Sequence, residues 1–318
     1  MNHPVDLRAT LSSLSRGRGD PSWRWDGPSA LWWATGTPEG PGLLRLWLRP
    51  GGRCVQAQAW GEGADWLLAG VPDLVGASDD PSRFRPLPHH NVLVRAWRAR
   101  PGWRVPRSRR VFDALAAAAL EQVVTGQESR QAWAQLVRRY GSPAPGPPAR
   151  PGGPAAGMVL PPAPQQWRRI PSWHWLQAGV GQHRRATVLA AARVADSLER
   201  TVELPPGQVE PALRALPGVG VWTAAEVRQR AHGDPDAFSF ADYHVAKNVT
   251  WALTGVAGDD DACAQLLRPY AGHRFRVQRL LELDGVMRPR HGPRMTLPDH
   301  LPVRWSQRPG SGPGTPAR

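Results

Sequence analysis

Apolar residues recur at helical spacing through most of the chain after residue 107. The first run consists of Phe112, Leu115, Ala116, Ala119, Leu120, Val123 and Val124. Positions three and four apart lie on one side of a helix, so this run predicts a buried helical face. Further helices are predicted over residues 127–140, 209–215, 245–253, 259–268 and 272–283. Their short connections favour an all-α arrangement.

The first hundred residues have a different pattern. Residues 43–48 and 54–60 alternate between apolar and polar positions, which predicts two strands separated by a turn at 50–52. Residues 65–74 predict a short helix. The many tryptophans of this region are either stacking platforms for bases or part of the core, and core packing is the favoured interpretation.

These patterns divide the chain into three parts. We expect an α/β domain over residues 1–103, an all-α domain over 104–287, and a Pro/Arg-rich tail over 288–318 that is partly disordered. Within the second part, residues 142–164 are rich in Pro, Gly and Ala and predict a flexible surface loop. The predicted fold class is therefore α+β.

Composition narrows the class of partner. The formal net charge of +14 favours a polyanion such as nucleic acid, although the arginine content also fits codon bias, because Lys247 is the only lysine among 40 basic residues. With only Cys54 and Cys263, we expect neither a disulfide framework nor a four-cysteine iron–sulfur cluster. No apolar run is long enough for a membrane span, so we expect a soluble cytoplasmic protein.

The run Leu-Pro-Gly-Val-Gly over residues 216–220 predicts a tight hairpin between two helices. Pro217 has no N–H, and Gly218 and Gly220 permit positive φ and close approach to another surface. Thr223 is positioned to cap the next helix, and the N–H groups around Val219 then converge beside a helix N-terminus. This geometry is typical of a phosphate site. The alternative is an ordinary helix–helix turn with a glycine cap.

The segment Ala-Asp-Tyr-His-Val over residues 241–245 follows the hairpin at the spacing seen in the helix-hairpin-helix DNA glycosylase superfamily (HhH-GPD). The chain resembles that family here. The run Gly-Val-Trp-Thr-Ala-Ala from residue 220, together with Asp242 and Tyr243, is most similar to its 3-methyladenine DNA glycosylase II (AlkA-like) branch. The resemblance implies an antiparallel-sheet domain before the helical domain, and Asp242 as the catalytic carboxylate. The alternative is that Asp242 only caps the helix that begins near Val245.

The resemblance also implies roles for other residues. Gln122 would face the gap in the DNA and Val123 would fill the space left by an extruded nucleotide, with a solvated helix-end amide as the alternative for Gln122. Glu121 departs from the branch, which more often has Gly-Gln. The carbonyls of Arg214, Leu216 and Val219 would bind a monovalent cation, Na⁺ or K⁺, and no other cofactor is expected.

The expected type of reaction depends on whether a lysine follows the hairpin. Family members that also cut the DNA backbone carry a lysine two residues after the second hairpin glycine, and Trp222 stands there. We therefore expect a monofunctional glycosylase in which Asp242 assists attack by water. Trp222 and Tyr243 would stack on a cationic alkylated purine; the alternative for Trp222 is packing under the hairpin. The last helix has no aromatic residue over 279–283, which departs from the branch.

The leading hypothesis is thus a base-excision-repair enzyme that removes 3-methyladenine-type bases from double-stranded DNA. We expect a nucleoid-associated monomer that does not bind membranes. The alternatives are a non-catalytic DNA-binding or damage-sensing protein, and a glycosylase for a deaminated or oxidised base.

Overall fold

Four antiparallel strands in chain order form the N-terminal sheet in a computed structural model that describes residues 5–49, 51–52 and 54–289. The strands are β1 (Trp23–Asp26), β2 (Ala30–Thr37), β3 (Gly40–Leu48) and β4 (Val55–Trp60). The two predicted strands correspond to β3 and β4, which pair from Leu43↔Trp60 to Leu48↔Val55. The turn between them includes Pro50, which lies outside the described residues. The model confirms the α+β fold class.

Both faces of the sheet are covered. On one face Leu31, Trp33 and Leu44 pack with α1 (Leu7–Leu11) and α2 (Ala64–Leu74). The other face presents Trp32, Ala34 and Leu43. Because side chains alternate along a strand, successive apolar residues of β2 supply both cores. Trp23, Trp32 and Trp33 are buried, as the packing interpretation expected.

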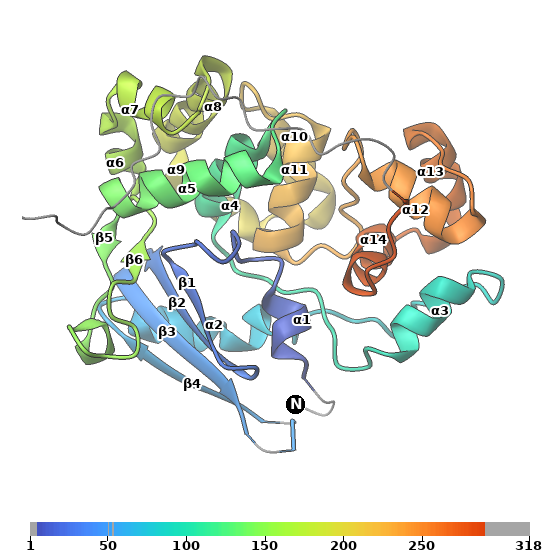
Figure 1. Ribbon diagram of the computed structural model, residues 1–318, viewed down its shortest axis with the longest axis horizontal. Coiled ribbons are helices and arrows are strands. Elements are labelled where there is room, and N and C mark those ends of the chain that lie inside the picture. The colour runs from blue at the N-terminus through green and yellow to red at the C-terminus, as the bar shows by residue number, and fades with distance from the viewer. Residues whose placement is uncertain (1–4, 50, 53, 290–318) are drawn as a thin grey trace, which may run out of the picture.

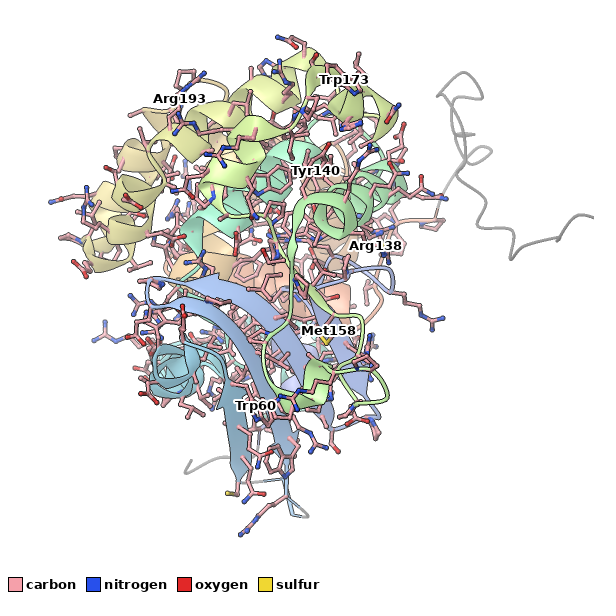
Figure 2. The ribbon with its side chains drawn as sticks, turned by 90° about the vertical axis from the view of Figure 1, so that its left-hand side faces the viewer. Trp60, Arg138, Tyr140, Met158, Trp173 and Arg193 are labelled. Atoms are coloured by element: carbon pink, nitrogen blue, oxygen red, sulfur yellow. The ribbon has the colours of Figure 1, made fainter. Side chains whose placement is uncertain are left out.

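The second face corrects one expectation. Residues 142–164 are a packed segment and not a flexible loop, because Ala155, Met158 and Leu160 are buried against Trp32. The segment contains β5 (Ser142–Pro143), η1 (Pro147–Ala149) and β6 (Val159–Leu160), and Figure 2 shows it crossing the strands between Met158 and Trp60. Its composition favours turns, but its few apolar side chains complete an otherwise open sheet face.

The larger core surrounds α4 (Val111–Glu121), whose alanines let neighbouring helices approach closely. The helices around it are α5 (Gly126–Tyr140), α6 (Pro164–Arg169), α7 (Ser172–Gln177), α8 (Gln182–Arg193), α9 (Ala195–Glu199), η2 (Arg200–Glu203), α10 (Pro206–Arg214), α11 (Val221–Val227) and η3 (Arg228–His232). Figure 1 shows this bundle above the sheet. The expected inward residues of α5, Trp133, Leu136 and Val137, are buried.

A third group of helices packs beside the bundle (Figure 1). It consists of α3 (Asn91–Arg98), α12 (Val245–Thr254), α13 (Asp260–Leu266), η4 (Arg268–Tyr270) and α14 (Arg274–Leu283). Its core joins Phe84, Leu93 and Trp103 to residues of α12 and α14, and a fully buried ion pair links Arg276 to Asp79. The segment just before residue 104 therefore packs with the end of the chain, so the expected division after residue 103 does not follow this packing.

Three further expectations concern the end of α4, membrane spans and the C-terminal tail. The helix α4 ends at Glu121, so Val123 and Val124 do not continue its buried face. No helix among the described residues is both long and apolar enough to cross a bilayer. The tail expected to be disordered lies, from residue 290 onward, outside the described residues.

Candidate active site

The predicted hairpin joins α10 to α11. The N–H of Val219 donates to the carbonyl of Leu216 over 3.1 Å, which closes a Pro-Gly turn with Gly218 at φ +82°. A Cβ on Gly218 would lie 2.1 Å from Thr187 Oγ1 of α8, whereas a Cβ on Gly220 would meet nothing within 4 Å. Within the described part of the chain, no acceptor is found for the exposed N–H of Gly218 or Gly220. These groups are free to bind an external anion.

Gln122 ties the end of α4 to this hairpin. Its Nε2 donates to the carbonyl of Gly218 and to Thr223 Oγ1, both over 2.9 Å. Thr223 consequently does not cap α11, which begins two residues earlier with Gly220 as N-cap. The amide of Gln122 therefore connects two elements that are distant in sequence, and it is not a free solvated group.

Val123, which follows Gln122, lies on the protein surface. Its side chain is fully exposed and its backbone has φ +53°. Positive φ is unusual for a β-branched residue, because the branched side chain crowds the following carbonyl. The turn between α4 and α5 thus projects an apolar side chain into solvent at a conformational cost, which is typical of functional positions.

Asp242 is held by three donors. Its Oδ1 accepts from the N–H groups of His244 and Val245 over 2.8 and 3.0 Å, and its Oδ2 accepts from Trp222 Nε1 over 3.1 Å. The two backbone bonds fix Asp242 to the turn that precedes α12, whose N-cap residue is His244. The bond from Trp222 adds a contact to the hairpin helix that capping does not require.

The two aromatic residues expected to face a base are placed differently. Trp222 is half-buried and lines a cleft together with Asp242 and His244. Tyr243 is 74% exposed, is not among the residues that line the cleft, and lies 4.0 Å beneath Lys247 Nζ. Of these two aromatic residues only Trp222 is thus positioned to contact a bound base in the cleft.

The cleft has a volume of about 1360 Å³ and crosses from the helical bundle to the N-terminal region. One wall carries Trp222 and Asp242. The opposite wall comes from the loop between α1 and β1, residues 12–20, which includes Arg16. Arg16 Nη1 donates to Glu121 Oε1 over 3.1 Å, so the unexpected carboxylate at the end of α4 is paired.

A second ion pair lies at the base of the cleft. Arg230 Nη1 donates to Glu226 Oε2 over 2.6 Å, and Ser239 Oγ donates to Glu226 Oε1 over 2.8 Å. Burial raises the pKa of Glu226, with Arg230 opposing that rise, and burial lowers the pKa of Arg16 despite the nearby Glu121. Desolvation therefore dominates both groups, and an unpaired charge here would be costly.

The carbonyls expected to bind a cation differ in their hydrogen bonds. Leu216 accepts the N–H of Val219, and the described residues contain no donor to the carbonyls of Arg214 and Val219. Asp234 and Asp236, expected in a turn, accept from Arg228 and Arg274 respectively. Within the described ranges, no group of three or more His, Cys, Asp or Glu side chains could hold a metal ion.

Several residues in or beneath the cleft were missed from the sequence. Arg16, Arg230, His244 and Arg279 line it, and Glu226 pairs with Arg230. A signal existed for two of them. Trp222, Glu226 and Arg230 are spaced four residues apart, which places them on one side of the helix, opposite the apolar stripe of Ala224, Val227 and Ala231. For Arg16, no local pattern marked its approach to a helix that begins almost a hundred residues later.

Comparison with known proteins gives similarity in structure but not in sequence. No protein-family model and no curated protein matches the chain. A 3-methyladenine DNA glycosylase from Archaeoglobus fulgidus superimposes with a TM-score of 0.72 at 15% identity, covering 90% of this chain and 97% of that one. An 8-oxoguanine glycosylase/lyase from Clostridium acetobutylicum, solved in complex with double-stranded DNA, gives 0.63 at 12% identity over 88% and 91%.

These matches extend over both the sheet and the helical bundle. The chain has the fold of the helix-hairpin-helix DNA glycosylases.

Proposed function

We propose that this protein is a monofunctional DNA glycosylase that hydrolyses the N-glycosidic bond of a damaged base. The observation that carries the proposal is the Asp242 carboxylate at the edge of a large cleft, held by two backbone N–H donors and by one hydrogen bond from Trp222 on the helix of the Pro-Gly hairpin. A capping aspartate needs no such contact.

The geometry of Asp242 suits stabilisation of positive charge. A carboxylate has about four acceptor positions, and three of those on Asp242 are used within the protein. The charge is therefore fixed in position, so it stabilises the cationic sugar of the transition state without reorganising. The remaining position on Oδ2 is available to orient a water molecule.

The proposed reaction is a hydrolysis. Water oxygen forms a bond to the sugar carbon C1′ while the bond from C1′ to the base nitrogen breaks. The electron pair leaves with the base nitrogen, so a cationic alkylated purine departs as a neutral base, whereas a neutral base takes up one proton as it departs. The water loses one proton, to that leaving base or to solvent. The products are the free base and an abasic site.

The hairpin and the turn after α4 would hold the DNA during this step. A base within a duplex must be extruded, which costs a few kcal/mol. The free N–H groups of Gly218 and Gly220 would bind the strand, with a monovalent cation at the carbonyls of Arg214, Leu216 and Val219 reinforcing the grip. Val123, exposed and rigidly projected, would occupy the space that the extruded nucleotide leaves.

The residues around the cleft favour a monofunctional enzyme. Cleavage of the backbone through a Schiff base requires an amine near C1′. Trp222 occupies the relevant helix position, and Lys247 is not among the residues that line the cleft, since its Nζ rests on the ring of Tyr243. Asp242-assisted hydrolysis is therefore the proposed outcome.

The first candidate substrate is an alkylated purine of the 3-methyladenine type. Trp222 offers its ring to such a base, and the Archaeoglobus fulgidus protein of similar fold is a 3-methyladenine DNA glycosylase. A second candidate is a deaminated or oxidised base, which is neutral. Among the described residues, Arg8, Arg18 and Arg24 line the cleft without forming an ion pair, and they favour this candidate because they repel a cation.

The test is the substitution Asp242→Asn, which keeps the size of the side chain and removes its charge. We expect the variant to bind duplex DNA containing an abasic site as the parent does, and to lose release of damaged bases by at least about 100-fold. Base release from methylated DNA, followed by chromatography, measures this. The control is Asp261→Asn, an exposed carboxylate of α13, which should leave release unchanged.

Undiminished base release by the Asp242→Asn variant would refute the catalytic role. If the unaltered protein binds damaged duplex tightly yet releases no base from any damaged DNA, the protein is instead a non-catalytic damage sensor.

A further inference from the structure

The loop over residues 12–20 forms a pre-arranged wall of the cleft. The N–H of Arg16 donates to Asp20 Oδ2 over 2.9 Å. Asp20 Oδ1 in turn accepts from Ser22 and from Trp133 Nε1 of α5, at 3.0 and 3.2 Å. Arg16 is therefore fixed relative to the helical bundle before any ligand binds.

The pair of Arg16 and Glu121 differs from the second ion pair in its unused hydrogen-bonding groups. Only Arg16 Nη1 and Glu121 Oε1 are engaged with one another. Among the described residues, no partner is found for Arg16 Nε, Arg16 Nη2 or Glu121 Oε2, and both residues line the cleft. Arg16 is 8% exposed as a residue and the Glu121 side chain is 25% exposed, so the carboxylate is the more open of the two.

Arg230 and Glu226, by contrast, use their hydrogen-bonding groups on each other and on neighbouring protein atoms. Arg230 Nη1 donates to the carboxylate and the carbonyl of Glu226, and Arg230 Nε donates to the carbonyl of Ser13. Glu226 uses its second oxygen to accept from Ser239. This pair holds the loop and the helix together and has little left to offer a ligand.

The unused groups of Arg16 and Glu121 amount to a hydrogen-bond donor beside an acceptor. Trp222 and Arg230 both line the cleft; Trp222 contacts Asp242, and Arg230 contacts Ser13 in the loop that carries Arg16, so the lining leads from Asp242 toward Arg16. A base whose sugar lies against Asp242 would extend in that direction. Its far edge would meet a guanidinium N–H and a carboxylate oxygen.

We propose that Arg16 and Glu121 read the base, and that they select a neutral base with adjacent C=O and N–H groups, that is, a cyclic amide. The carbonyl oxygen would accept from Arg16 and the ring N–H would donate to Glu121. A methylated adenine carries an amino group in place of the carbonyl and a positive charge, so it places a donor and a cation against the Arg16 guanidinium. This inference rests on the proposed glycosylase function and specifies its substrate class as that of deaminated and oxidised bases.

The energetic basis is the desolvation of the pair. A site built to hydrogen-bond a base discriminates strongly against an analogue that lacks the group, because its own polar atoms then stay unpaired. Both partners are charged, which makes each such bond stronger than a neutral one.

The experiment compares two purines on the same protein preparation, hypoxanthine in a synthetic duplex and 3-methyladenine in methylated DNA. The variants are Arg16→Gln and Glu121→Gln. For each we expect release of hypoxanthine, as kcat/KM, to fall at least 10-fold while release of 3-methyladenine changes less than 3-fold. The ratio of the two rates does not depend on the folded fraction, so a partly unfolded variant remains informative.

Arg230→Gln is the matched control, because it breaks a buried pair with no groups left for a ligand. It should lower both rates equally. An equal effect of Arg16→Gln and Glu121→Gln on both purines would overturn the inference and make their pair purely structural. Release of 3-methyladenine but not hypoxanthine by the unaltered protein would also overturn it, while leaving the glycosylase function intact. Release of no base from either DNA would instead overturn the proposed function itself.

Discussion

Single residues in unusual conformations concentrate around the cleft. Val123 and Ala241 both have positive φ, and each directly follows or precedes a residue of the candidate site. Gln122 and Asp242, the two neighbours, each hydrogen-bond to the hairpin or to its helix. Strain at such positions is retained because the surrounding contacts determine the backbone there.

Val123 offers a prediction that separates stability from function. Val123→Gly relieves the positive φ, worth about 1–2 kcal/mol, and since the side chain is fully exposed it removes no packing. Glycine's greater freedom in the unfolded chain offsets up to about 1 kcal/mol of this, so the free energy of unfolding should rise by about 0.5–1 kcal/mol. Base release from duplex DNA should nevertheless fall, because the space of the extruded nucleotide is no longer filled. Urea denaturation and a base-release assay measure the two effects.

Val256→Gly is the control, since Val256 is also an exposed valine but is absent from the positive-φ residues. It should lower stability slightly, through the greater freedom of glycine in the unfolded chain, and leave base release unchanged. A loss of stability in Val123→Gly would contradict the assignment of strain at residue 123.

At the level of elements, the hairpin depends on close packing against a neighbouring helix. Gly218 meets Thr187 of α8 on one side and accepts from Gln122 at the end of α4 through its carbonyl. Three helices are thereby fixed to one turn. The two glycines of the hairpin differ in backbone conformation and in the space around them, so substitutions at the two positions can be compared.

Gly218→Ala should destabilise the protein by about 2–4 kcal/mol, because its Cβ would lie 2.1 Å from Thr187 Oγ1 at a φ of +82°. Gly220→Ala should cost about 1 kcal/mol or less, since its φ is −89° and its Cβ would meet nothing within 4 Å. Denaturant unfolding of both variants tests this. Equal losses would show that the packing on Thr187 does not constrain the hairpin.

The helices also show what the spacing of apolar residues can predict. The spacing of apolar residues located α4, α5, α12 and α14 within a few positions, because a helix face is a local property of the sequence. It misjudged residues 142–164, since the sheet face that buries Met158 belongs to another part of the chain. It likewise extended α4 through Val124, although the helix stops where Gln122 turns toward the hairpin.

For the molecule as a whole, acid should weaken the fold through a histidine of the helical bundle. His232, at the end of η3, contacts Thr201 Oγ1 over 3.0 Å, and burial lowers its pKa from 6.5 to about 4. Between those values the unfolded chain binds more protons than the native protein. This contribution to stability is therefore complete above pH 6.5 and declines as the pH falls toward 4.

The loss should amount to about 1.4 kcal/mol per pH unit within that window, and roughly 3 kcal/mol in total. His232→Gln should flatten the decline, as measured by urea denaturation at pH 7, 6 and 5. The exposed His183, replaced in the same way, serves as control and should leave the slope unchanged. Parallel curves for the His232 variant and the parent would contradict the assignment to this residue.

What the sequence determined by itself is local. The Pro-Gly hairpin, its spacing to Asp242, the aromatic residue in place of a lysine, and the helical periodicity can all be read within short windows, because turn and helix preferences arise from neighbouring residues. Those features predicted the fold and the candidate carboxylate.

Only the tertiary structure decided what surrounds that carboxylate. Arg16 and Glu121 are 105 positions apart, and Trp222 reaches Asp242 across 20. Such contacts depend on how the sheet, the loop over residues 12–20 and the bundle pack together, and that packing is set by the sum of many apolar contacts distributed over the whole chain. The physical reason is that a buried charge must be paired because its desolvation is costly. Nothing in the neighbouring sequence identifies a partner that lies far away along the chain.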